Sequence, residues 1–122
     1  MPTRSAKPSP LLVAARSSPG LETILRQFQA VQLEVVFAAT TDAAVALLMG
    51  NPFSAVVLDA ALIRNDDWTV AKSLKLIKPN IPIVLLDARR LGDRKALPAN
   101  IDVLISSDDP NEILVKIRQL IC

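Results

Sequence analysis

Asp59 has the position in the sequence that most suggests chemistry. It directly follows four apolar residues, Ala55–Leu58, and Asn51 and Pro52 mark a turn shortly before them. A short unbroken apolar run between turn signals is typical of a strand buried on both faces. A carboxylate at the end of such a strand needs a partner or water, because an unpaired buried charge is costly. Ligands of open parallel sheets bind beyond the carboxyl ends of the strands, so Asp59 marks the candidate site.

The elements that must position Asp59 are apolar runs alternating with segments of helical periodicity. The expected strands cover residues 11–15, 35–39, 53–59, 81–86 and 103–105. Stripes of apolar residues at helical spacing lie between most of them and after the last one. Alternation of this kind predicts an α/β fold with right-handed crossovers. We therefore expect a single doubly wound, flavodoxin-like domain with a five-stranded parallel sheet in the order 2-1-3-4-5 and helices on both faces.

Capping residues set the expected helix boundaries. In chain order, the caps are Ser18 with Pro19 at the first helical position, Thr40 or Thr41, Asn65 or Asp66, and Asp109. Trp68 is expected to begin the third helix and to pack on one of its faces. Only a short helix fits between Asp87 and Asn100, because Gly92 and Pro98 interrupt that segment.

Composition excludes several classes of site. The 122 residues suffice for one core, and we expect a flexible arm over 1–9, one domain over 10–122 and no attached output domain. The chain has no histidine, which excludes histidine-ligated metals and Ser–His or Cys–His nucleophiles. Cys122 is the single cysteine, which excludes an internal disulfide and fits a reducing compartment. No apolar run approaches the roughly 20 residues that span a bilayer, so we expect a cytoplasmic protein.

The carboxyl ends of the expected strands meet at one edge of the sheet. They bring together Ala15, Arg16, Ala39, Thr40, Asp59, Asp87, Ala88, Ser106 and Ser107. With the segments Phe53–Asp59, Ile81–Ala88 and Asp102–Pro110, the chain resembles the receiver domains of bacterial two-component response regulators, of the chemotaxis type. The resemblance spans about Pro10 to Cys122, and it depends on the order and spacing of several segments.

The resemblance implies a mechanism. Receiver domains accept a phosphoryl group from a histidine kinase on an aspartate that ends the third strand. An acidic pair after the first strand holds magnesium, and a Thr or Ser and a Lys after the fourth and fifth strands contact the phosphoryl oxygens. By this resemblance Asp59 is the phosphoacceptor position. The other positions differ: the acidic pair falls on Ala15 and Arg16 or on Ala14 and Ala15, the hydroxyl on Asp87, and the lysine on Ser106.

These differences alter the expected chemistry. Magnesium is disfavoured without the acidic pair, and any ion would have only Asp59 and the backbone of Ala61. A phosphoryl group would also face the charge of Asp87. Because the loss of one stabilising donor lowers a reaction rate ~10²–10³-fold, fast phosphoryl transfer is not expected. Two interpretations of Arg16 stay open: a built-in cation paired with Asp59, Asp87 or both, or a solvated loop residue. Without the resemblance, Asp59 would be interpreted as a cap for nearby backbone N–H groups.

The leading functional prediction is a receiver domain in phosphorelay signalling, non-enzymatic and without a cofactor, whose partner is a histidine kinase or an output protein. The alternative is a pseudo-receiver that binds partners without phosphorylation. A flavodoxin-like carrier is disfavoured because no Gly-rich loop is present. The net charge of +2 and the 3% aromatic content argue against nucleic-acid binding by this chain alone, and no membrane partner is expected. A homodimer, and the role of the basic segment Arg89–Lys95 as solvated loop or docking patch, stay open.

Overall fold

One parallel sheet forms the centre of the molecule. The structure is a computed structural model that describes residues 9–63, 68–87, 100–106 and 109–121. Its strands are β1 (Leu11–Ala14), β2 (Val35–Ala38), β3 (Ala55–Asp59), β4 (Ile83–Leu86) and β5 (Val103–Ile105). They pair in parallel in the order β2-β1-β3-β4-β5, so the predicted fold class and strand order are confirmed.

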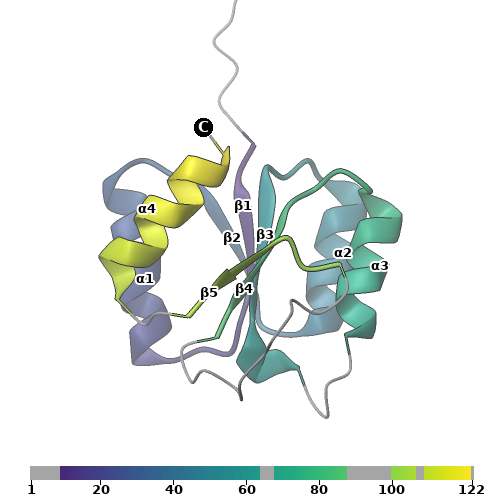
Figure 1. Cartoon of the computed structure of the whole chain (residues 1–122), viewed down its shortest axis with the longest axis horizontal. Coiled ribbons are helices and arrows are strands. Elements are labelled where there is room, and N and C mark those ends of the chain that lie inside the picture. The colour runs from purple at the N-terminus through teal and green to yellow at the C-terminus, as the bar shows by residue number, and fades with distance from the viewer. Residues whose placement is uncertain (1–8, 64–67, 88–99, 107–108, 122) are drawn as a thin grey trace, which may run out of the picture.

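Helices cover both faces of this sheet. The helices α1 (Pro19–Ala30) and α4 (Pro110–Ile121) lie on one face, and α2 (Thr41–Gly50) and α3 (Thr69–Ile77) lie on the other (Figure 1). Strand residues alternate between two buried clusters, with Leu12 and Ala14 on the α2/α3 side and Leu11 and Val13 on the α1/α4 side. Both faces are therefore apolar, which explains why the strands read as unbroken apolar runs.

β4 begins later than predicted. The expected strand started at Ile81, whereas the structure places its first residue at Ile83. Pro82 has no N–H to give to the ladder, and the N–H of Ile81 donates to the carbonyl oxygen of Lys78 at 3.1 Å. The carbonyl oxygen of Pro82 still accepts from Val56 N–H at 2.9 Å, so this proline sits at the entrance of the strand without breaking the sheet.

Three predicted caps hold the helix starts. The side-chain oxygens of Ser18 and Thr40 accept backbone N–H bonds of 3.1 Å and 3.0 Å at the starts of α1 and α2. Thr40, and not Thr41, is therefore the cap of α2. The Oδ1 of Asp109 accepts a backbone N–H bond of 3.0 Å at the start of α4. These bonds satisfy N–H groups that the helices leave without an internal partner.

The start of α3 differs from the prediction. Trp68 is the N-cap and does not begin the helix, because its φ of −93° and ψ of 15° are not helical, and Thr69 is the first helical residue. As predicted, Trp68 packs against a buried cluster, the one on the α2/α3 side. The predicted caps Asn65 and Asp66, the short helix expected between Asp87 and Asn100, and the arm over residues 1–8 lie outside the described residues.

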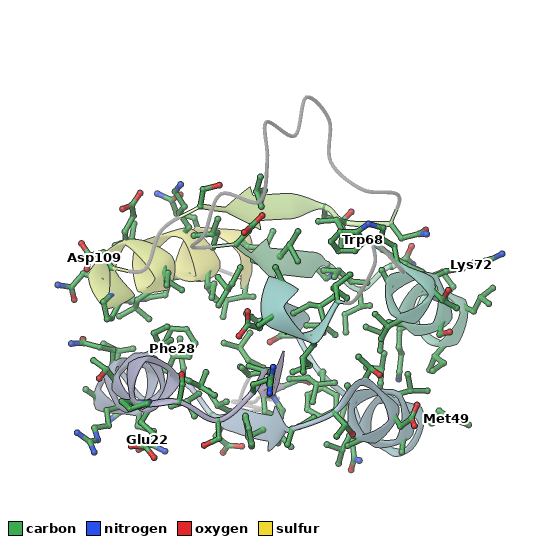
Figure 2. The ribbon with its side chains drawn as sticks, turned by 90° about the horizontal axis from the view of Figure 1, so that it is seen from below. Glu22, Phe28, Met49, Trp68, Lys72 and Asp109 are labelled. Atoms are coloured by element: carbon green, nitrogen blue, oxygen red, sulfur yellow. The ribbon has the colours of Figure 1, made fainter. Side chains whose placement is uncertain are left out.

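The end of α1 is a tight backbone turn. Gln32 has a φ of 64°, in the left-handed region. Its N–H donates to the carbonyl oxygen of Gln29 at 3.0 Å, and the N–H of Leu33 donates to that of Phe28 at 2.9 Å. This pair of bonds is the Schellman arrangement that closes helices, usually with glycine in the position of Gln32. Phe28 is fully buried, on the side of α1 that faces α4 (Figure 2).

Candidate functional site

The carboxyl ends of β1 and β3 place Ala15 beside Asp59. The register between these strands joins Ala14 to Leu58, so the next residue of each strand is also a neighbour. Ala15 is only 1% exposed, and its N–H donates to the carbonyl oxygen of Ala38 at 3.0 Å. A buried methyl group therefore occupies a place where the resemblance would put a magnesium-binding carboxylate.

Asp59 itself caps a turn of its own loop. It is half-buried at the end of β3, and its Oδ1 accepts the N–H of Ala61 at 2.9 Å. This bond starts the short 3₁₀ helix η1 (Ala60–Leu62), for which Asp59 is the N-cap. The contact is the one expected from the interpretation of Asp59 as a backbone cap. The carboxylate thus has a structural task whether or not it has a chemical one.

Asp87 follows β4 at the same edge. The register joins Asp59 to Leu86, so Asp87 lies one residue beyond that pair. Its backbone N–H donates to the carbonyl oxygen of Ile105 at 3.0 Å, which fixes it against β5. Asp87 is 3% exposed and is the only buried charged residue among those the structure describes. A phosphoryl group at Asp59 would therefore approach an edge that already contains a buried carboxyl group.

Ser106 is exposed directly after β5, in the position that the resemblance assigns to lysine. Its hydroxyl is short and uncharged, so it offers no ammonium group to a phosphoryl oxygen. The register therefore brings Ala15, Asp59, Asp87 and Ser106 to one edge, as predicted, but this set contains no positive charge. We find no group of three or more His, Cys, Asp or Glu in the described ranges that could hold a metal ion, and the residues at this edge do not fit magnesium.

Strand alternation directs Arg16 and Asp59 to opposite faces of the sheet. Arg16 follows the parity of Ala14, which packs on the α2/α3 side, whereas Asp59 follows that of Val57, which packs on the α1/α4 side. Arg16 is exposed, and no ion pair between described residues includes it. Of the two open interpretations, the pairing of the Arg16 guanidinium with Asp59, Asp87 or both is thus not found among the described residues. Strand alternation explains why it does not reach Asp59.

Comparison with known proteins gives a fold but no close relative. No family model and no curated protein match the sequence. A receiver domain of a sensor histidine kinase from Pseudomonas aeruginosa matches with a TM-score of 0.80 at 18% identity, over 94% of this chain and 98% of that one. A receiver domain protein from Methanospirillum hungatei gives 0.78 at 17%, over 93% of each chain. A receiver protein from Sinorhizobium medicae gives 0.72 at 22%, over 96% and 97%. This chain has the receiver fold.

The receiver fold confirms the resemblance at the level of architecture. The Pseudomonas domain has a magnesium ion coordinated in its active-site cleft. In this chain, the buried Ala15 stands where the resemblance would put a magnesium-binding carboxylate, and the exposed Ser106 stands where it would put a lysine. The basic segment Arg89–Lys95 and Cys122 lie outside the described residues. None of the helices in the described part of the chain is both long and apolar enough to span a bilayer.

Two features of this receiver fold were not predicted from the sequence. One is the groove on the α2/α3 side of the edge, which Arg16 and Asp42 both line. A signal for this groove was present in the sequence, because the acidic Asp42 lies in the first turn of α2, shortly after the cap Thr40. The other is the contact between Lys75 and Asp102 at the opposite edge, for which the sequence gives no local signal because the residues are 27 positions apart.

Proposed function

We propose that this chain is a receiver module of phosphorelay (two-component) signalling in which Asp59 occupies the phosphoacceptor position, and that it signals by binding partners and not by fast phosphoryl transfer. The receiver fold supports the first part of the proposal. The second part depends on one observation, the buried methyl group of Ala15 beside the half-buried carboxylate of Asp59.

Electrostatics supports the second part. Phosphoryl transfer is accelerated by cations that neutralise the charge spreading over the equatorial oxygens. Ala15 supplies no metal ligand, Ser106 supplies no ammonium group, and Asp87 adds a carboxyl group to the same edge. Each missing donor of this kind is worth ~10²–10³ in rate. Transfer to Asp59 by the metal-assisted route is therefore expected to be slower by several orders of magnitude.

A conventional phosphoacceptor is the second candidate function. Asp59 is half-buried and not fully enclosed, so a small phosphodonor can reach the edge of the sheet. In that case Asp59 would exchange its bond to Ala61 N–H for contacts to the phosphoryl group. The two candidates predict different covalent chemistry for the same carboxylate, so one measurement separates them.

The deciding experiment is intact mass measurement after incubation with acetyl phosphate and magnesium. The proposal expects no phosphoryl adduct, and no magnesium-dependent change in the fluorescence of Trp68, the single tryptophan. A stable adduct in the wild-type chain that is lost in Asp59→Asn would overturn the partner-binding mode and favour the conventional acceptor. A receiver domain with an intact acidic pair, run in parallel, shows that the reagent is active.

Partners and location are parts of the same proposal. The partner is a histidine kinase or an output protein, and the compartment is the cytoplasm. Pull-down of purified candidate kinases with wild-type and Asp59→Asn chains tests the partner directly. Equal capture by both chains is expected, because binding in this proposal does not depend on phosphorylation. Whether two copies associate is measured by light scattering over a range of concentrations.

A further inference from the structure

A groove of ≈ 520 Å³ opens at the carboxyl edge of the sheet on the α2/α3 side. Its walls come from the ends of β1 and β2, from η1, and from the two helices that lie side by side on that face (Figure 1). Asp59 is not among its lining residues, so the groove is separate from the acceptor carboxylate. Its volume falls within the roughly 300–1,000 Å³ typical of small-molecule sites.

Two side chains of opposite charge line this groove and do not form an ion pair with each other. Arg16 enters from the end of β1, and Asp42 enters from the first turn of α2. Both are exposed, and neither forms an ion pair with any residue in the described part of the chain, so their charged atoms are more than 4.0 Å apart. Each charge is therefore available to a ligand that reaches the groove.

The surface between these charges is part polar and part apolar. The side chains of Thr41 and Ser73, both half-buried, bring hydroxyl groups to the wall. Val45 on α2 and Val70 on α3, also half-buried, add apolar surface. A ligand lying across the groove would thus cover methyl groups with its carbon chain while its polar ends stay near hydroxyls or charges.

The charge arrangement selects the chemical class of the ligand. A guanidinium binds a carboxylate through two parallel N–H bonds, and a carboxylate accepts bonds from an ammonium group. A ligand with only negative charge would be repelled by Asp42, and one with only positive charge would be repelled by Arg16. We propose that this groove binds a small zwitterion of the amino-acid kind, with its carboxylate on Arg16 and its ammonium group on Asp42. This inference does not rest on any chemistry at Asp59.

The test uses the full chain, labelled with ¹⁵N, and a series of ω-amino acids as rulers. Glycine, β-alanine, γ-aminobutyrate and 5-aminovalerate carry the same two charges at increasing separation. We expect changes in the backbone amide chemical shifts of residues 39–42 and 69–73. The dissociation constants should be millimolar, which corresponds to a binding free energy of about −4 kcal/mol. The best member of the series should bind at least about tenfold more tightly than butyrate or butylamine, which each carry one charge. No shift at these residues with any of the four overturns the proposal.

Charge-removing variants identify the two contacts. Arg16→Gln should lose the preference over butylamine, and Asp42→Asn should lose the preference over butyrate, each with a roughly tenfold weaker affinity for the best zwitterion. Arg26→Gln and Glu22→Gln are matched controls, because both residues are exposed on α1, outside the groove, and should bind as the wild type does. Thermal unfolding checks that each variant is folded. Unchanged binding in folded Arg16→Gln or Asp42→Asn overturns the proposal, as does butyrate binding equal to that of the best zwitterion.

Discussion

Lys75 Nζ lies 2.7 Å from Asp102 Oδ2 and donates a second bond of 2.8 Å to the carbonyl oxygen of Ile81. The same Oδ2 accepts the N–H of Ile83 at 2.8 Å. These bonds join the end of α3 to the segments that lead into β4 and β5, at the edge of the sheet opposite the candidate site. The pair thus anchors one helix to two strands by charge-assisted hydrogen bonds.

Loss of Lys75 should destabilise the fold modestly. Lys75→Gln is expected to lower the free energy of unfolding by about 0.5–1 kcal/mol, because the pair is partly solvated and its ammonium also holds a backbone carbonyl. The measurement is urea unfolding at neutral pH. Lys72→Gln is the matched control on the same helix, since Lys72 is exposed and points away from the sheet (Figure 2). Equal effects of the two variants would contradict a stabilising role for the pair.

The contribution of Asp102 should depend on pH. Burial raises the pKa of Asp102, but the hydrogen bond and charge of Lys75 and the N–H of Ile83 outweigh this effect, so the pKa lies below its usual value of 3.8. Because the folded-state pKa is depressed, the stabilisation is present above the unfolded value and is lost as pH falls through the folded value. Asp102→Asn should therefore be less stable than wild type near neutral pH. The difference should shrink in acid, below 3.8, and a constant difference would show that ionisation is not involved.

Asp59 should stabilise the chain as a cap. Asp59→Ala removes the acceptor of Ala61 N–H and is expected to cost about 1 kcal/mol in chemical unfolding. Asp59→Asn keeps a side-chain oxygen that can accept the same bond, so it should lower the free energy of unfolding by only a small fraction of the loss in Asp59→Ala. If both variants lose the same stability, the hydrogen bond to Ala61 is not the source of the effect. This pair of variants also separates the structural role of Asp59 from any phosphorylation.

Gln32→Gly should raise stability. Gln32 has a φ of 64°, a conformation that costs a residue with a Cβ roughly 1–2 kcal/mol. Glycine removes this cost but adds disorder to the unfolded chain, so a net gain of about 0.5–1 kcal/mol is expected in urea unfolding. Gln29→Gly lies inside the helix three residues earlier and should instead lose roughly 0.5–1 kcal/mol. A loss of stability in Gln32→Gly would show that the side chain makes a contribution larger than the backbone strain.

Ala15→Asp should create a magnesium response that the wild-type chain lacks. A carboxylate in this buried position beside Asp59 is expected to cost about 1–3 kcal/mol in the absence of metal, from desolvation and like-charge repulsion. Magnesium should then raise the melting temperature of the variant, since a ligand that binds only the folded chain stabilises it. The wild-type melting temperature should not change with magnesium. Equal responses in both chains would refute the proposed part of Ala15 in excluding the ion.

Local signals in the sequence predict most of the fold. The strands follow from apolar runs, and caps such as Ser18 and Thr40 follow from residues whose oxygens reach backbone N–H groups within three positions. The position of Arg16 relative to Asp59 depends on which face of the sheet each residue occupies. The alternation of the strand, counted from Ala14, gives that face for Arg16. The contact between Lys75 and Asp102 requires the crossover from α3 to β5, so no local pattern could reveal it.

The buried methyl group of Ala15 has a consequence for how a cell could use this protein. A module that changes shape on modification reports the activity of an upstream enzyme, whereas the proposed partner-binding mode involves no such change, because Ala15 supplies no metal ligand beside Asp59. If partner binding is the output, occupancy of the partner follows mass action alone. The strength of the signal would then be set by the rates at which the protein is synthesised and degraded.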